Sequence, residues 1–360
     1  MTSSQIDAEP TDTRRTALAR FCLTVAIGAA GAAGFNWLGL PAAWLSGAMI
    51  VVAAATFAGL RAKFPTGIQP PLYTLLGMTM GSGVTPEVVH RIGDWPVSLA
   101  GLAVVVALVM AATFFFLRNV CGWTREEAYF AAIPGALTFV MAVASDRRTD
   151  VTRFSTAHII RLFFLVAALP LFIGQAGGAG MGGGAEAAPV PLEDTALGLV
   201  ICVAASFAAV RLRIPGGWLT GAFFASALAS GTGFLDTHVP DWALIPCFVI
   251  LGASIGIRFC EISPAMLLRL LAASVGAFAV GLTVSVVGAL AVALTLGIPA
   301  GQVLLAYAPG GLEVMMLLAY LLDMDPAFVA AHQLARYIAL ILILPPVTLA
   351  VLGRSPRGGA

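Results

Sequence analysis

The sequence predicts an all-α polytopic membrane protein made of two inverted repeats, with about ten transmembrane helices and two re-entrant or broken helices. Three observations lead to this fold class: the composition, an internal duplication and the distribution of basic residues. Of the 360 residues, 59% are apolar and only 10% are charged, and the mean hydropathy is +0.96. Soluble domains carry about 25% charged residues, so most of this surface must face lipid.

The duplication is visible as two copies of the same sequence pattern, offset by 174–175 residues. "PAAWLSGA" from Pro41 matches "PGGWLTGA" from Pro215, and "LGMTMG" from Leu76 matches "LGASIG" from Leu251. The longest match aligns 134–170 with 309–345 without a gap and includes Pro-Gly, Asp and Arg in register. Internal repeats of this kind are typical of secondary transporters.

Each half contains six apolar segments, and the fifth is interrupted by glycine and proline. The segments lie near 17–38, 42–60, 69–84, 97–117, 126–146 and 151–174, and near 194–210, 217–234, 242–257, 265–296, 301–322 and 327–352. The predicted organisation is a cytoplasmic tail at 1–16, a first membrane repeat at 17–175, a Gly/Ala/Pro linker at 176–193, a second membrane repeat at 194–353 and a cytoplasmic tail at 354–360.

The basic residues decide between two topologies. If all twelve segments cross the membrane, Lys and Arg divide almost evenly between the two sides. If the fifth segment of each half re-enters, 16 of the 19 basic residues lie inside, Arg91 lies outside, and Arg161 and Arg336 lie within spans. Positive residues favour the cytoplasmic side, which favours five spans per half, inverted repeats and both termini in the cytoplasm.

Composition also argues against several functions. The net charge of +1, without a basic block, gives no surface for nucleic acid. The five cysteines form no CxxC pattern and indicate packing rather than a disulfide or metal site. No Ser/His, paired-Asp or HExxH arrangement is present at usable spacing. We therefore expect no enzyme activity and no cofactor, and a metal site between His158 and His332 is a minor alternative.

Two arginines are the strongest candidates for a solute site. Arg161 and Arg336 are each 27 residues after the proline of a broken segment, and each is about ten residues into a span. An arginine near the bilayer centre is expensive unless paired, so it is a functional hypothesis by default. The alternative is that each arginine only ties hairpin carbonyl groups to the sixth helix.

The other candidates surround these arginines. His158 and His332 lie one helical turn before them and are candidates for proton coupling, or else neutral rings bonded to backbone. Glu313 follows the second break and is a third coupling candidate, or else a charge that complements a helix N-terminus. The breaks themselves would present free N–H groups to a solute anion; they comprise Pro134, Gly135, Pro309, Gly310 and Gly311.

Two further pairs of equivalent positions have structural interpretations. Asp150 and Asp325 precede the sixth segments and are predicted helix N-caps. The glycines of "LGMTMG" and "LGASIG" form small-xxx-small faces, which favour close helix packing over ligand binding.

The chain resembles the AbrB-type bacterial membrane protein family in its duplication and in these motifs. The match also includes "IPGAL" and "RRTDVTRFSTAHIIRLFFLVAALP" in the first half, which correspond to "APGGL" and "LDMDPAFVAAHQLARYIALILILPP" in the second. The resemblance covers about 17–352. Members carry the names ammonia monooxygenase or AbrB-family regulator of gene expression. The first break reads Pro-Gly-Ala rather than the family's Pro-Gly-Gly. More loosely, the broken segments are similar to the cation/proton antiporter and bile-acid symporter superfamily, whose repeats are inverted.

These observations favour an inner-membrane secondary transporter of a small anionic solute, with proton coupling and a mid-membrane site between the two broken helices. The expected partners are the lipid bilayer and a small-molecule solute, without nucleic acid, and a homodimer is left open. The alternative is a membrane protein that acts in regulation of gene expression as a sensor or partner without solute transport.

Overall fold

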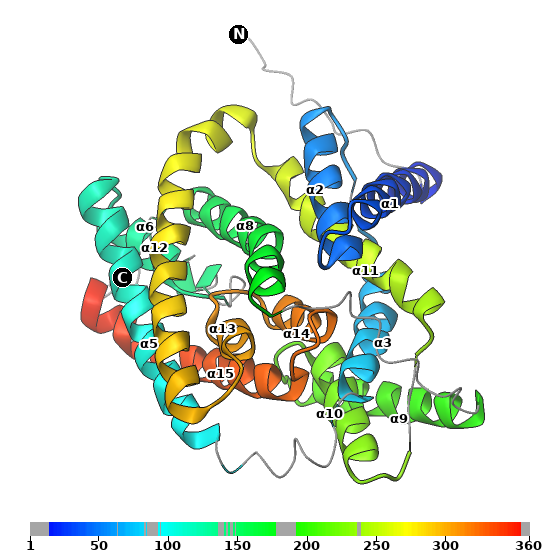
Figure 1. The fold of residues 1–360 in the computed structure, drawn as a ribbon. Coiled ribbons are helices and arrows are strands. Elements are labelled where there is room, and N and C mark those ends of the chain that lie inside the picture. Colours follow the sequence, from blue (N-terminus) through cyan, green and yellow to red (C-terminus); the bar gives the residue numbers. More distant parts are fainter. Residues whose placement is uncertain are drawn as a thin grey trace.

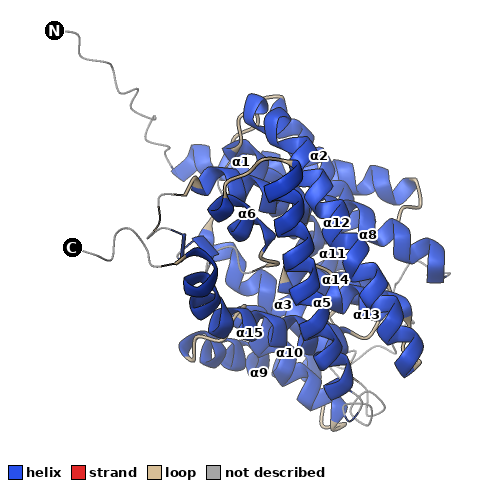
Figure 2. Ribbon diagram, turned by 90° about the vertical axis from the view of Figure 1, so that its left-hand side faces the viewer, coloured by secondary structure: helices blue, strands red, loops and turns tan. Residues whose placement is uncertain are grey.

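The structure of the protein is a computed structural model, and helices are the regular secondary structure of the part it describes (Figures 1 and 2). It describes residues 14–62, 64–82, 84, 93, 95–135, 140–141, 143–144, 147, 149–177, 192–235 and 239–353. Most of the predicted tails at 1–16 and 354–360 and of the linker at 176–193 lies outside these residues.

Each predicted apolar segment contains a helix. The helices of the first half are α1 (Arg14–Trp37), α2 (Ala43–Phe57), α3 (Gln69–Ser82), α5 (Trp95–Phe115), α6 (Arg125–Ala132) and α8 (Val151–Gly177). Those of the second half are α9 (Leu192–Arg211), α10 (Gly217–Gly231), α11 (Asp241–Gly256), α12 (Pro264–Leu296), α13 (Ala300–Tyr307), α14 (Leu312–Leu321) and α15 (Pro326–Leu352). A π-helical turn, η3 (Phe116–Val120), extends α5, and a 3-10 turn, η4 (Ile257–Glu261), extends α11.

Long apolar helices make the chain a multi-pass membrane protein. Seven helices of the described residues are long and apolar enough to cross a bilayer. They correspond to α1, α5, α8, α9, α11, α12 and α15, while α2 and α14 are shorter apolar helices. The outer faces keep large apolar side chains exposed, such as Leu294 at 85% and Val200 at 64%. Lipid is the environment in which such faces are stable.

Helices of one half pack against helices of the other in a reciprocal pattern. The third helix of the first half, α3, packs against α10, while α11 packs against α2 (Figure 1). "PAAWLSGA" and "PGGWLTGA", here called the proline-tryptophan motif, stand at the starts of α2 and α10, and "LGMTMG" and "LGASIG" lie on α3 and α11. The LGxxxG motif of each half therefore lies on a helix that contacts the proline-tryptophan helix of the other half. This exchange joins the two halves into one core.

Glycine makes this close packing possible. A Cβ on Gly81 would lie 2.5 Å from the Phe223 carbonyl oxygen of α10, and a Cβ on Gly256 would lie 2.5 Å from the Met49 carbonyl oxygen of α2. Gly77 and Gly252, one turn earlier, approach the partner backbone at least as closely. The predicted packing role of these glycines is confirmed.

The predicted N-caps are also present. The Asp150 carboxylate accepts hydrogen bonds from the N–H groups of Thr152 and Arg153 at the start of α8. The Asp325 carboxylate accepts from those of Ala327 and Phe328 at the start of α15. Both sixth helices therefore begin at equivalent residues, which fixes the register in which they present their arginines.

The base of the first broken helix is anchored by polar groups. The Thr124 hydroxyl and Glu127 form a capping box at the start of α6. Glu127 also accepts from Arg153 of α8 at 3.0 Å, and Glu126 pairs with Arg147 at 3.2 Å. These contacts fix the start of α6 against the start of α8.

Candidate functional site

The fifth segment of each half is broken where the sequence predicts. In the first half α6 ends at Ala132, and Gly135 has a φ of +80°, which glycine adopts without strain. In the second half α13 ends at Tyr307 and α14 begins at Leu312 after the Pro-Gly-Gly break. The residues 136–139, directly after the first break, lie outside the described residues, and they include Thr138, which aligns with Glu313.

The two breaks touch each other although they are 175 residues apart. A Cβ on Gly135 would lie 3.3 Å from the Gly310 carbonyl oxygen and 3.3 Å from Nη2 of Arg336. A larger side chain at residue 135 would therefore separate the breaks. The predicted pair of broken helices forms a single junction in the interior of the protein.

The two arginines cap the first limbs of the broken helices. Arg161 donates from Nη1 to the Ala131 carbonyl oxygen at 3.3 Å and from Nη2 to the Ile133 carbonyl oxygen at 3.1 Å. The last carbonyl groups of a helix have no intrahelical donor and carry partial negative charge. The guanidinium group donates to two of them, which accommodates the arginine in the interior of the protein.

Arg336 does the same with shorter hydrogen bonds. Its Nη1 donates to the Ala308 carbonyl oxygen and its Nη2 to the Gly310 carbonyl oxygen, both at 2.6 Å. The tie between arginine and hairpin carbonyl groups, one of the two interpretations of the sequence, is therefore present in both halves. Both arginines also line a cavity, described below, so the tie and a solute role are compatible.

Gln333 is a site residue that the sequence analysis missed. Its Nε2 donates to the Leu305 carbonyl oxygen at 2.8 Å and to the Ala306 carbonyl oxygen at 3.2 Å, while its Oε1 accepts from Arg336. The repeat alignment without a gap places Gln333, rather than His332, opposite His158. That alignment was the signal that would have identified it.

The two histidines occupy different environments. His158 lines the cavity; its Nδ1 lies 3.0 Å from the Phe154 carbonyl oxygen, and its buried Nε2 has no hydrogen-bond partner in the described part of the chain. His332 is fully buried outside the cavity lining. Its Nε2 lies 2.9 Å from the Ser98 hydroxyl, and its Nδ1 lies 2.7 Å from the Phe328 carbonyl oxygen. The structure therefore brings one predicted histidine to the site and not the other.

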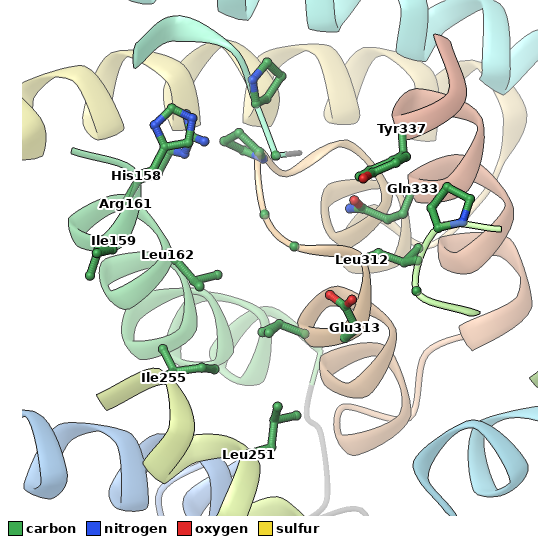
Figure 3. A pocket seen from close by; sticks show the side chains of 18 of the residues that line it. His158, Ile159, Arg161, Leu162, Leu251, Ile255, Leu312, Glu313, Gln333 and Tyr337 are labelled. Atoms are coloured by element: carbon green, nitrogen blue, oxygen red, sulfur yellow. The ribbon is translucent and has the colours of Figure 1, made fainter. Parts of the chain in front are cut away.

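A cavity of about 250 Å³ surrounds the junction (Figure 3). Every predicted site residue except His332 lines it. Those residues are Pro134, Gly135, His158, Arg161, Pro309, Gly310, Gly311, Glu313 and Arg336. Unpredicted polar lining comes from Tyr73 of α3, Ser254 of α11, Arg258 of η4, and Gln333 and Tyr337 of α15. The cavity is thus built by both halves of the chain.

Glu313 projects its carboxylate into this cavity from the first turn of α14 (Figure 3). Tyr337 and Gln333 lie on α15 across the space, and His158 and Arg161 lie on α8. Pro215 and Gly216, from the repeated proline-tryptophan motif, also reach the cavity at the start of α10. Sequence analysis did not connect this motif with the site, because nothing local relates it to the broken segments.

In the described part of the chain, no group of three or more His, Cys, Asp or Glu side chains is placed to hold a metal ion. The lining of the cavity supplies groups for charge and hydrogen-bond interactions: guanidinium groups, one carboxylate, hydroxyl groups and helix ends.

The fold and the cavity together define a class: a multi-pass, all-helical membrane protein with a polar cavity at the junction of two broken helices. Within that class the chain belongs to the AbrB family, because residues 44–351 match the family described as "Transition state regulatory protein AbrB". It is 23% identical over 336 residues to "Putative regulator AbrB" of Escherichia coli (strain K12), covering 91% of this chain and 95% of that protein. It is 24% identical over 350 residues to "Uncharacterized protein YhjN" of Bacillus subtilis (strain 168), covering 89% and 90% respectively.

Proposed function

We propose that this protein is an inner-membrane secondary transporter of a small anionic solute, with proton movement coupled through the cavity. The observation that carries the proposal is the polar cavity at the contact between two broken helices, lined by Arg161, Arg336 and Glu313. Gly/Pro-interrupted segments at corresponding places of two repeats are the usual location of a transporter's binding site.

The charges around the cavity favour an anion. The two guanidinium groups contribute about +2, the C-terminal ends of α6 and α13 about −1, the N-terminal ends of α10 and α14 about +1, and Glu313 −1. The sum is about +1 even when Glu313 is ionised, and Arg258 adds a further positive charge. Binding of an anion would reduce this excess of positive charge.

The proposed topology has ten spans, two re-entrant hairpins, inverted repeats and both termini in the cytoplasm. Its support is the distribution of basic residues, with 16 on one side and one on the other. In this topology Arg258, Tyr73 and the start of α10 all lie toward the cytoplasm, so the cavity opens inward. Alternating access would then close this side and open the other by movement of one group of helices against the other.

Reconstitution into proteoliposomes that contain a pH-sensitive dye tests the proposal. Addition of a panel of small carboxylates is expected to give proton flux with at least one member. Arg161→Ala and Arg336→Ala should each abolish that flux, and Arg269→Ala, an exposed arginine at the start of α12, should not. Normal flux in both cavity variants would remove the arginines from the proposed site.

Regulation of gene expression is the second candidate function, favoured by the family description and by the printed name of the Escherichia coli relative. In that case the protein would act as a membrane sensor or partner that binds its effector without moving it. Binding of a carboxylate to the purified protein, with no flux for any member of the panel, would favour this candidate.

A further inference from the structure

Two helix N-termini without side-chain caps face the cavity. α10 begins after Gly216 and α14 begins after Gly311, and within the described residues no side chain accepts a hydrogen bond from the first N–H groups of either helix. Pro215, Gly216 and Gly311 all line the cavity. The first N–H groups of a helix lack intrahelical acceptors and carry partial positive charge. Two sets of donors therefore converge on one space.

The Glu313 carboxylate stands between these two N-termini. Its Oε1 lies 3.5 Å from the position of a Cβ on Gly216, and its Oε2 lies 3.7 Å from that of a Cβ on Gly311. In the described structure Glu313 makes no hydrogen bond and no ion pair. An ionised carboxylate without a direct partner is costly within a membrane, so its presence here indicates a functional role.

The other ionisable groups around the cavity do not neutralise Glu313 directly. Arg161 and Arg336 direct hydrogen bonds to helix carbonyl groups instead. The remaining ionisable groups that line the space are Tyr73 of α3, Arg258 of η4, His158 of α8 and Tyr337 of α15. His158 supplies a second observation at the same cavity, because its buried Nε2 is unpartnered among the described residues.

We propose that a carboxylate group of the solute binds between the N-termini of α10 and α14, where the ionised Glu313 side chain acts as an internal competitor. Protonation of Glu313 removes the competing charge and allows the side chain to leave this position. The solute anion and one proton then occupy the cavity together and move in the same direction. This inference deepens the proposed transport function and rests on it.

The cavity is large enough for a small solute. Its volume of about 250 Å³ is many times the roughly 10–15 Å³ of such volume that one water molecule needs. Small monocarboxylates fit in this space, and their movement with one proton is electroneutral.

The test measures equilibrium binding of three radiolabelled probes, acetate, pyruvate and lactate, to the purified full-length protein between about pH 6 and pH 9, where such carboxylates stay ionised. In the wild type the affinity should fall as the pH rises, approaching tenfold per pH unit once Glu313 is ionised, because the fraction of competent protein falls by that factor. Glu313→Gln should bind at least one probe with little pH dependence and, at the highest pH, at least tenfold more tightly than the wild type.

Asp323→Asn is the matched control, because Asp323 is exposed at the far end of α14 and asparagine tolerates its positive φ. It should keep the pH dependence of the wild type. Glu313→Ala is the second variant if the glutamine variant does not fold.

Two results would overturn the inference. One is that the folded Glu313 variants bind none of the three probes. The other is that a Glu313 variant keeps the pH dependence of the wild type. Failure of the transport function is distinguishable from both. If the wild type shows flux but Glu313→Gln keeps the pH dependence of binding, only the inference about Glu313 fails. If the wild type binds a probe with the expected pH dependence but shows no flux, the transport function fails and the proposed binding site remains.

Discussion

The tie between Arg336 and the end of α13 makes a specific prediction about stability. Arg336→Met keeps much of the side-chain volume but removes both 2.6 Å hydrogen bonds to the carbonyl oxygens of Ala308 and Gly310. A hydrogen bond to a charged group contributes about 1.5–3 kcal/mol, so two of them set an upper range of about 3–6 kcal/mol. The cavity adjoins these carbonyl groups, and water entering it would replace part of the loss. We therefore expect destabilisation of about 3 kcal/mol, at the lower end of this range.

Arg161→Met is the internal comparison. Its hydrogen bonds, at 3.3 and 3.1 Å, are longer than those of Arg336, and among the described residues Arg161 has no counterpart to the Gln333 contact. The loss of stability should therefore be smaller, about 1–2 kcal/mol.

The midpoint of SDS-induced unfolding in mixed micelles measures both effects, with Arg269→Met as an exposed control that should be near neutral. The reasoning fails if Arg336→Met unfolds at the midpoint of the wild type. It also fails if the ranking of the two cavity arginines is reversed.

Two further predictions concern the packing and the ends of helices. Gly252→Val would place side-chain atoms closer to the α2 backbone at Leu45 than van der Waals contact allows. It should therefore destabilise the protein by about 2–3 kcal/mol in the same unfolding assay, or prevent folding. The control is the same substitution at Gly34, where a Cβ meets nothing within 4 Å. Asp325→Ala removes the acceptor for two N–H groups at the start of α15 and should lower the stability by about 1 kcal/mol, whereas Asp325→Asn should retain most of it, and equal losses in both would contradict the capping role.

Local sequence signals predicted the features of the site that lie within one segment. The Pro-Gly breaks, the arginines at a fixed distance after them and the N-capping aspartates are each legible from spacing alone, and the structure contains all three. The packing glycines were likewise predicted by their four-residue spacing.

What the sequence did not predict depends on the contacts between segments. Pro215 and Gly216 reach the cavity because α10 packs against α3 of the other half, and Tyr73 reaches it through the same contact. No local pattern predicts which helix of one repeat will contact which helix of the other.

The two histidines show the limit of reasoning from helix faces. Residues three and four positions before an arginine both lie near its face, yet they are one residue apart and so differ by about 100° around the helix. That rotation directs Gln333 toward Arg336 and the end of α13, and His332 toward Ser98 of α5. Only the alignment of the two repeats distinguishes these positions before a structure is available.

The arrangement of the two halves as inverted copies is the central claim, and single-cysteine labelling from each side of the membrane tests it most directly. Arg213→Cys lies in the short turn between α9 and α10, and Phe234→Cys lies just beyond the other end of α10; both positions are exposed. In a cysteine-free background, the account predicts that a membrane-impermeant maleimide added to intact cells labels Phe234→Cys but not Arg213→Cys, which becomes reactive only when the cytoplasmic side is opened. Labelling of Arg213→Cys from outside, with Phe234→Cys protected, would mean that the copies run in parallel and would contradict the account.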